Sequence, residues 1–355
     1  MKTSSNQSIA FLNPRLGSGN IGDALIEHSI KKILRYDPRR SIDIDPRQRL
    51  STESIDAINQ CDVAVILGTN LWYREISRPG RWQISCADID RIRVPIIPFG
   101  VGTTRHRGED NRFDSKSLAL LSALHQQCTE ASVRDPRTQQ ALAQNGIRNV
   151  RMTGCPTLFR SLSRDWTFTP ALGSRKIMIT PRKGQQRNLY RLAAELKRRA
   201  WQVEVAAQVA KDTWYGKRHI PGLGSPPRLV QSKPPLPMLF QPHLEPYLDS
   251  VDRSFGAIGW RLHGNLMHLA MGKPAAFFAN CSRADSFCEA FGLPRVYAED
   301  GELIPDSTLY MAIDQLADPT VYSNFKSHYR YYYDETVKFL EANRLNHNLT
   351  KARSR

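Results

Sequence analysis

A permanent cation and a titratable imidazole lie one residue apart in the stretch Arg261-Leu262-His263-Gly264. Residues 251–259 before it read as a short buried strand, and residues 265–272 have helical spacing that ends at Gly272-Lys273-Pro274. The pair is therefore expected at a strand-to-helix turn, where backbone amides and the positive end of the helix dipole favour anions. The pattern suits phosphate chemistry, but an Arg and a His at this spacing also occur in purely structural turns.

A glycine-bearing loop, Gly17-Ser18-Gly19-Asn20-Ile21-Gly22-Asp23, follows the first predicted strand and opens a helix. Its amides can approach an anion or a sugar closely, and Asn20, Gly22 and Asp23 are the candidate binding residues. The spacing differs from Gly-x-Gly-x-x-Gly and the P-loop Lys is absent, which argues against a nucleoside triphosphate. Asp23 has a second interpretation, as the cap of the helix predicted over residues 24–36.

Two more glycine-bearing loops follow predicted strands at the same edge of the sheet. One begins at Gly68, and the other contains Gly100 and Gly102 and continues to Arg105 and His106. Two interpretations of this basic loop stay open: a site for a charged ligand, or a solvated turn.

Arg134 ends the fifth predicted strand, in Ser132-Val133-Arg134-Asp135. An Arg at a strand end can clamp a carboxylate or phosphate through two parallel hydrogen bonds. The alternative is a structural ion pair with Asp135 or another acidic neighbour. Asp135 is also placed to cap the helix that follows Pro136.

Alternating strands and helices position these loops. In the N-terminal half we predict strands at residues 8–12, 41–44, 62–67, 95–99, 130–133 and 150–153, and helices at 24–36, 53–60, 115–127 and 138–145. In the second half we predict strands at 176–180, 202–208, 257–258 and 275–279, and helices at 189–200 and 265–272. This alternation predicts an α/β fold with two doubly wound parallel sheets.

The predicted domains are residues 1–165 and 175–320, followed by a C-terminal helix and a frayed tail at 321–355. Residues 210–242 contain seven prolines and are too long for a routine connection. This Pro-rich segment is either a functional lid or a surface insertion.

Composition excludes several classes of protein. With 355 residues and 41% hydrophobic content, the chain can build two cores, but no apolar run approaches the roughly 20 residues of a bilayer span, so we expect a cytoplasmic protein. The six cysteines show no Cys-x-x-Cys spacing, so neither a zinc cluster nor a disulfide framework is indicated. The formal charge of +16 would steer anionic partners, including a peripheral contact with an anionic membrane. Nucleic acid is not expected, because no basic block is interleaved with aromatic residues.

Four ordered landmarks resemble those of the polysaccharide pyruvyl transferase family: Gly19-Asn20-Ile21-Gly22-Asp23-Ala24-Leu25-Ile26, Ser132-Val133-Arg134-Asp135, Gly154-Cys155-Pro156 and Arg261-Leu262-His263-Gly264. The resemblance spans residues 11–292. It implies two Rossmann-like domains facing a cleft, as in glycosyltransferase-B folds, with the acceptor on the N-terminal and the donor on the C-terminal domain. It also implies transfer of a pyruvyl group from phosphoenolpyruvate to hydroxyls of a saccharide or lipid-linked saccharide, forming a ketal and releasing phosphate.

The resemblance also suggests roles for individual residues. Phosphoenolpyruvate carries a phosphate and a carboxylate, so Arg134, Arg261 and Arg283 are the candidates that bind it. His263 is the candidate general acid that protonates the enol methylene. The scheme needs no metal and no cofactor beyond phosphoenolpyruvate as co-substrate.

Three residues depart from the family pattern. Cys155 stands where members commonly have Asp, Thr69 where they often have Gly, and Arg283 where they often have Lys. Two alternative functions stay open: a nucleotide-sugar-dependent glycosyltransferase of the same architecture, and a non-catalytic carbohydrate-binding relative, for which Cys155 is the main motive.

Overall fold

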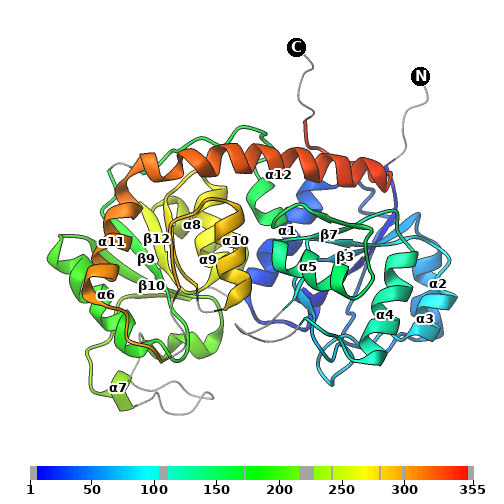
Figure 1. The fold of residues 1–355 in the computed structure, drawn as a ribbon, viewed down its shortest axis with the longest axis horizontal. Helices are drawn as coiled ribbons and strands as arrows, with labels where there is room; N and C mark the ends of the chain where they lie inside the picture. The colour runs from blue at the N-terminus through cyan, green and yellow to red at the C-terminus, as the bar shows by residue number, and fades with distance from the viewer. Residues whose placement is uncertain are drawn as a thin grey trace. The chain divides into compact units, whose positions relative to one another are not determined.

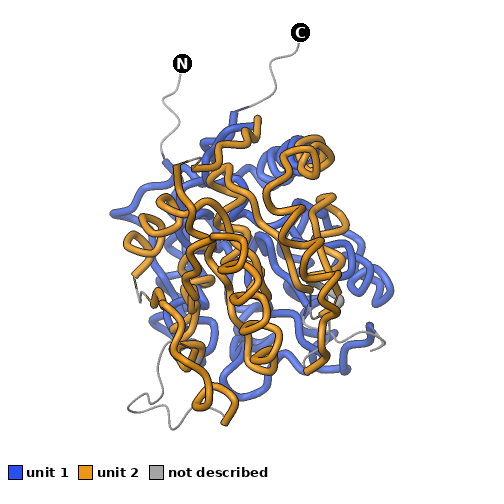
Figure 2. The backbone as a smooth tube through the Cα atoms, turned by 90° about the vertical axis from the view of Figure 1, so that its left-hand side faces the viewer, with its two compact units in different colours: residues 1–18, 26–164, 329–355 blue, residues 19–25, 165–328 orange. Residues whose placement is uncertain are grey.

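The computed structural model describes residues 6–103, 111–171, 173–215, 228–240, 243–279, 281–297 and 301–350. The chain divides into two compact units, coloured separately in Figure 2. Unit 1 comprises residues 1–18, 26–164 and 329–355, and unit 2 comprises residues 19–25 and 165–328. Residues 19–25, which the sequence alone would group with the N-terminal domain, therefore belong to unit 2.

Unit 1 is built on a parallel sheet with the strand order β2-β1-β3-β5. These strands are β1 (Ile9–Leu12), β2 (Ile42–Ile44), β3 (Val63–Leu67) and β5 (Ile96–Phe99). β1, β3 and β5 are buried along their whole length, as expected for strands covered on both faces. Each of the four strands that we predicted here is confirmed, with its start one residue later.

Two smaller strand pairs extend unit 1. β7 (Ala131–Val133) and β8 (Val150–Met152) pair in parallel, and a bridge between Val101 and Val133 joins β7 to the chain just after β5. β4 (Asn70–Trp72) and β6 (Gly102–Thr103) pair between the loops that follow β3 and β5, and neither strand is predicted by its local sequence.

The helices of unit 1 begin at polar residues that accept backbone hydrogen bonds. Ser51, Asp114 and Asp135 cap α2, α4 and α5, and for Asp135 this confirms the predicted cap. A helix that we did not predict, α3, starts with a capping box of Ser85 and Asp88. The bounds are α1 (Ile21–Ile33), α2 (Thr52–Asn59), α3 (Cys86–Arg91), α4 (Ser115–Gln126), α5 (Pro136–Gln144) and α12 (Ser323–Ala342), with the short 3₁₀ helices η1 (Pro14–Gly17) and η2 (Pro156–Phe159); α1 and α12 also contribute residues to unit 2.

Unit 2 contains a six-stranded parallel sheet with the order β11-β10-β9-β12-β13-β14. Counted along the chain this is 3-2-1-4-5-6, the strand order of Rossmann folds. The strands are β9 (Lys176–Thr180), β10 (Gln202–Ala207), β11 (Met238–Phe240), β12 (Gly256–Gly259), β13 (Ala275–Ala279) and β14 (Arg295–Tyr297).

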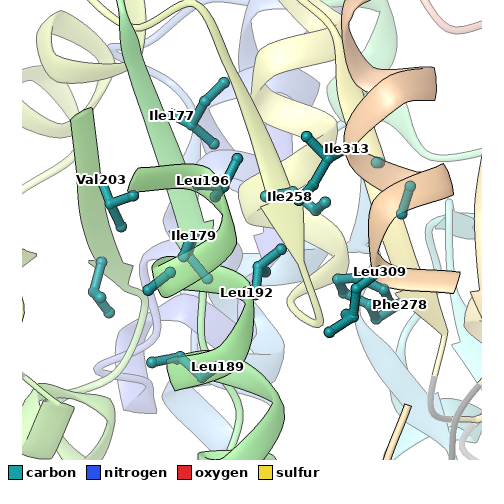
Figure 3. Close-up of a cluster of buried hydrophobic side chains, with 14 of the residues drawn as sticks. Ile177, Ile179, Leu189, Leu192, Leu196, Val203, Ile258, Phe278, Leu309 and Ile313 are labelled. Carbon is teal, nitrogen blue, oxygen red and sulfur yellow. The ribbon is translucent and has the colours of Figure 1, made fainter. Parts of the chain in front are cut away.

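Helices cover both faces of this sheet (Figure 1). Ile177 and Ile179 of β9 pack with α6 and α11 in the cluster shown in Figure 3, whereas Met178 between them packs with α8, α9 and the first turn of α1. Successive side chains of a strand point to opposite faces, so this alternation buries β9 on both sides. The bounds are α6 (Gln186–Arg198), η3 (Ala210–Tyr215), α7 (Arg228–Gln231), α8 (Leu244–Asp252), α9 (Leu262–Ala270), α10 (Ser282–Ala290), α11 (Asp306–Ala317) and η4 (Pro319–Tyr322).

Two predictions around the Arg-x-His motif were wrong in detail. Residues 251–259 are not one strand, because α8 runs to Asp252 and β12 covers only Gly256–Gly259. The following helix starts at Leu262 rather than at residue 265, so Arg261 is its N-cap and His263 lies in its first turn. The first error arises because an apolar run that is only a few residues long does not distinguish a strand from the end of a buried helix.

The Pro-rich segment 210–242 is partly regular structure. η3 lies at its start, and β11 is the edge strand that pairs with β10. Residues 216–227 and 241–242 lie outside the described part of the chain. A lid or a simple insertion therefore does not describe the whole segment, because β11 completes the sheet of unit 2.

Candidate functional site

The Arg-x-His motif lies at the topological switch point of unit 2. β9 and β12 are neighbours in the sheet, and the strand order runs outward from them in opposite directions. In sheets of this type ligands bind beyond the carboxyl ends of the strands at such a point. Thr180 ends β9, and Arg261 follows β12, with its N–H donating to the Thr180 hydroxyl over 3.3 Å.

Asp212 holds the guanidinium of Arg261. The Nη2 of Arg261 donates to both carboxylate oxygens, at 3.0 and 2.7 Å, and its Nε donates to Asp212 Oδ2 at 3.1 Å and to the Pro181 carbonyl at 3.2 Å. The Asp212 side chain is 1% exposed and that of Arg261 19%. No hydrogen bond in the described part of the chain involves Arg261 Nη1, so its two N–H groups remain available for a ligand.

The loop of residues 19–25 lies against His263. A Cβ added to Gly22 would be 3.1 Å from the Cβ of His263, so any larger residue would press on the imidazole. The loop is fixed by a hydrogen bond from Gly22 N to Asn20 Oδ1 of 3.0 Å and by one from Ile21 N to the Gln208 carbonyl of 3.0 Å. Unit 2 therefore brings together the first and the last of the four sequence landmarks.

Asp23 does not have the capping role that we considered for it. α1 starts at Ile21, three residues earlier than predicted, and Asn20 precedes it with its side chain turned back to the helix amides. Asp23 lies inside the first turn, where a carboxylate interacts favourably with the helix dipole. The Asx turn at Asn20 is the local signal that would have given the correct start.

Buried polar residues of α9 anchor the motif rather than reach a ligand. Asn265 accepts from the Thr180 hydroxyl at 2.9 Å and donates to the carbonyls of Gly259 and Ala276, each at 3.0 Å. His268 is fully buried between the Ser254 hydroxyl and the Gly264 carbonyl, and burial lowers its pKa to about 4. The imidazole of His268 is therefore neutral at pH 7 and structural.

Unit 1 gathers the other predicted loops at the ends of β3, β5 and β7. A Cβ on Gly68 would lie 2.2 Å from the Gly100 carbonyl oxygen, and one on Gly100, whose φ is +69°, would lie 2.5 Å from Pro156 Cδ. A Cβ on Gly102 would lie 2.4 Å from Arg134 Nε. These glycines are thus required for close packing of the loops, in addition to any contact with a ligand.

Arg134 is nearly completely buried, at 1% exposure, and its Nη2 donates to Asn70 Oδ1. Asp135 accepts from the Thr138 amide at 2.9 Å and from the Thr138 hydroxyl at 2.8 Å. Asn70, which the sequence does not single out, is therefore a polar partner of Arg134. Asn70 belongs to β4, whose pairing with β6 is seen only in the structure.

Cys155 is fully buried, and its Sγ lies 3.0 Å from the Thr157 hydroxyl oxygen. A thiol suits this enclosed position better than a carboxylate, because an ion without solvent needs a partner charge. The effect of Cys155 on activity stays a prediction.

Three of the predicted basic residues lie wholly or partly outside the described residues. Arg105 and His106 lie outside the described residues, and Arg283 is the second residue of α10, with its side chain outside the described part. Within the described residues there is no group of three or more His, Cys, Asp or Glu side chains that could hold a metal ion. Among the helices described, none combines the length and apolar composition that crossing a bilayer requires.

The sequence model of the family described as "Polysaccharide pyruvyl transferase" matches residues 20–236. The chain belongs to this family. The protein is therefore an enzyme of the pyruvyl transferase type that acts in polysaccharide biosynthesis, as the landmarks predicted. The match ends before Arg261 and His263, so the case for those two residues rests on geometry. No curated protein matches the sequence.

Comparison with solved structures finds several that are similar to this pyruvyl transferase. UDP-N-acetylglucosamine 2-epimerase from Rickettsia bellii has 11% identity and a TM-score of 0.51, with 95% of this chain and 96% of that chain covered. UDP-GlcNAc 2-epimerase from Methanocaldococcus jannaschii has 10% identity and a TM-score of 0.49, with 94% of this chain and 99% of that chain covered. The glycosyltransferase SnogD from Streptomyces nogalater has 11% identity and a TM-score of 0.41, with 95% of this chain and 96% of that chain covered. The first of these likenesses concerns the fold alone. Together with the two parallel sheets it confirms the predicted α/β class with Rossmann-like domains of the glycosyltransferase-B type.

Proposed function

We propose that this pyruvyl transferase moves a pyruvyl group from phosphoenolpyruvate to two hydroxyls of a saccharide, forming a ketal and releasing phosphate. The observation that carries the proposal is the arrangement at the switch point of unit 2. There Arg261 is held by Asp212 with its Nη1 available, and His263 lies in the first turn of α9.

The donor is proposed to bind through its anionic groups. Arg261 Nη1 offers two N–H donors, and the amides at the start of α9 add the positive end of the helix dipole. Asp212 acts as a positioning residue, since it fixes the guanidinium from the side opposite to Nη1. Arg134 and Arg283 remain the further candidates for the carboxylate and phosphate of the donor.

In the proposed reaction, His263 donates a proton to the methylene carbon of phosphoenolpyruvate as the C=C electron pair forms the new C–H bond. The first acceptor hydroxyl attacks the resulting cationic carbon, and its proton returns to His263. The C–O bond to phosphate then breaks, with the electron pair leaving on phosphate. The second hydroxyl attacks the same carbon to close the ketal, and its proton leaves with phosphate.

The acceptor is proposed to approach the loop of residues 19–25, because this loop lies against His263. Asn20 and Asp23 carry the polar side chains suited to sugar hydroxyls there. The formal charge of +16 would favour an acceptor presented at an anionic membrane surface, such as a lipid-linked saccharide.

The test is calorimetric binding of phosphoenolpyruvate to the wild type, Arg261→Ala, His263→Ala and the control Arg253→Ala, which removes an exposed Arg of unit 2. We expect binding by the wild type and the control, a loss of at least tenfold in Arg261→Ala, and retained binding in His263→Ala. With an acceptor found by screening, phosphate release should be lost in His263→Ala. Unchanged binding in Arg261→Ala would refute the donor site, and binding of a nucleoside diphosphate but not of phosphoenolpyruvate would favour the glycosyltransferase alternative.

A further inference from the structure

A cavity of about 490 Å³ lies in unit 1. It is lined by β8, α5, α12 and the residue before β7, and the residues that matter here are Glu130, Gln139, Arg151, Tyr331, Tyr332 and Glu335. Its volume falls within the roughly 300–1,000 Å³ of small-molecule sites. Its lining also includes Pro136 at the start of α5 and Val150 and Met152 of β8, whereas Arg134 is not part of it.

The charged groups of the cavity are paired with one another. Arg151 donates to both oxygens of Glu130, at 2.6 and 2.7 Å, and to Glu335. Glu335 also accepts from Lys338 at 2.6 Å. Two carboxylates therefore face one guanidinium and one ammonium, so the group has no net charge to attract an anion or a metal cation. Each carboxylate keeps lone pairs that can accept hydrogen bonds from hydroxyls.

An exposed aromatic side chain stands at this cavity. Tyr331 is 57% exposed, and its ring meets that of Tyr332 edge-on, with 5.0 Å between ring centroids. The neighbouring Tyr329 and Tyr333 on α12 are fully buried, and their hydroxyls donate to the backbone carbonyls of residues 163 and 162. α12 is thus fixed by its buried tyrosines, while Tyr331 contributes little to the core and presents its ring to solvent.

This combination of groups fits a sugar. A pyranose has an apolar C–H face that can lie on an aromatic ring, and a rim of hydroxyls that both donate and accept hydrogen bonds. Tyr331 supplies the ring, the carboxylates of Glu130 and Glu335 supply acceptors, and Gln139 supplies an amide whose Nε2 already donates to the Val150 carbonyl at 3.2 Å. A phosphorylated ligand would instead meet two carboxylates at close range.

We infer that this cavity is a binding site for a neutral saccharide, separate from the donor site of unit 2. A pyruvyl transferase that modifies a polysaccharide would gain from such a site, because it holds a sugar residue of the chain while another residue reacts. The side chains of unit 1 would bind the saccharide whether or not phosphoenolpyruvate is the donor.

The test measures binding of defined sugars to the full chain. The probes are methyl glycosides of glucose, galactose, mannose and N-acetylglucosamine and their linear tetrasaccharides, followed by calorimetry or ligand-observed NMR. The variants are Tyr331→Ala and, as a matched control, Tyr310→Ala, which removes an exposed tyrosine from α11 of unit 2. Phosphoenolpyruvate binding is measured on the same samples.

We expect at least one probe to bind the wild type and Tyr310→Ala equally, and Tyr331→Ala to bind it at least tenfold more weakly. Phosphoenolpyruvate binding should be the same in all three proteins. If no probe binds, or if Tyr331→Ala binds as well as the wild type, the inference is wrong. A failure of phosphoenolpyruvate binding alone would count against the proposed function and leave the saccharide result intact.

Discussion

The buried ion pair of Asp212 and Arg261 gives the sharpest test of the site's energetics. Arg261→Ala would leave the Asp212 carboxylate, which is 1% exposed, without the guanidinium that now makes four contacts of at most 3.2 Å to it and to Pro181. Removing one partner of a buried pair costs about 3–5 kcal/mol, because the remaining charge loses the interaction that offset its desolvation. Arg261 is 19% exposed, so water screens part of the interaction and we expect the lower end, about 3 kcal/mol.

The matched variants are Asp212→Asn and the double variant Asp212→Asn/Arg261→Ala. Asp212→Asn should cost less than Arg261→Ala, about 1–2 kcal/mol, because the partly exposed guanidinium can turn to water. In the double variant no buried charge remains, so its cost should be smaller than the sum of the single costs by about 1.5–2 kcal/mol.

The free energy of unfolding of the four proteins is measured by urea titration, with circular dichroism and tryptophan fluorescence compared to detect separate unfolding of the two units. Costs of the single variants that add up in the double variant within about 0.5 kcal/mol would refute the reasoning. In that case Asp212 and Arg261 would not interact in solution, and Asp212 would not have the positioning role that we assign to it.

Three further predictions concern burial and close packing. Burial lowers the pKa of His268 from 6.5 to about 4, so below pH 6.5 the unfolded chain takes up a proton that the folded chain does not. The free energy of unfolding should therefore fall by about 3 kcal/mol between pH 6.5 and 4, and this group should not affect it above that range. His268→Gln should remove this part of the pH dependence in urea titrations. Gly22→Ala would place a Cβ 3.1 Å from the Cβ of His263, the candidate general acid, and should reduce turnover about tenfold with little loss of stability. Gly19→Ala has open space around its Cβ and should leave turnover unchanged, so equal activities of the two variants would count against the role of this loop. Gly100→Ala combines a φ of +69° with a contact of 2.5 Å to Pro156, and it should lower the free energy of unfolding by more than Gly146→Ala does. Gly146 has a φ of +85° but open space around it, so its substitution should cost about 1 kcal/mol. Calorimetric melting of both variants checks this order, and the reverse order would contradict the role of close packing at Gly100.

Local sequence signals located most of the regular structure. The apolar runs Val63–Leu67 and Ile177–Ile179 identify strands because burial on two faces demands apolar side chains at successive positions. Asp135 with Pro136 identified a helix start for an equally local reason. The short strands β4 and β6 and the two edge strands β11 and β14 escaped prediction, since they exist only through pairing with neighbours that the sequence does not indicate.

For the candidate site, too, some features follow from the sequence and others only from the tertiary structure. The sequence by itself determined the α/β class, the family landmarks and the residue types Arg134, Arg261 and His263, because these depend on patterns within a few residues. The tertiary structure alone decided that residues 19–25 join unit 2 beside His263, and that Arg261 is held by a carboxylate 49 residues earlier in the chain. The physical reason is that such contacts depend on which strands become neighbours in a sheet. Strand order follows from the packing of the whole unit, which local periodicity does not specify.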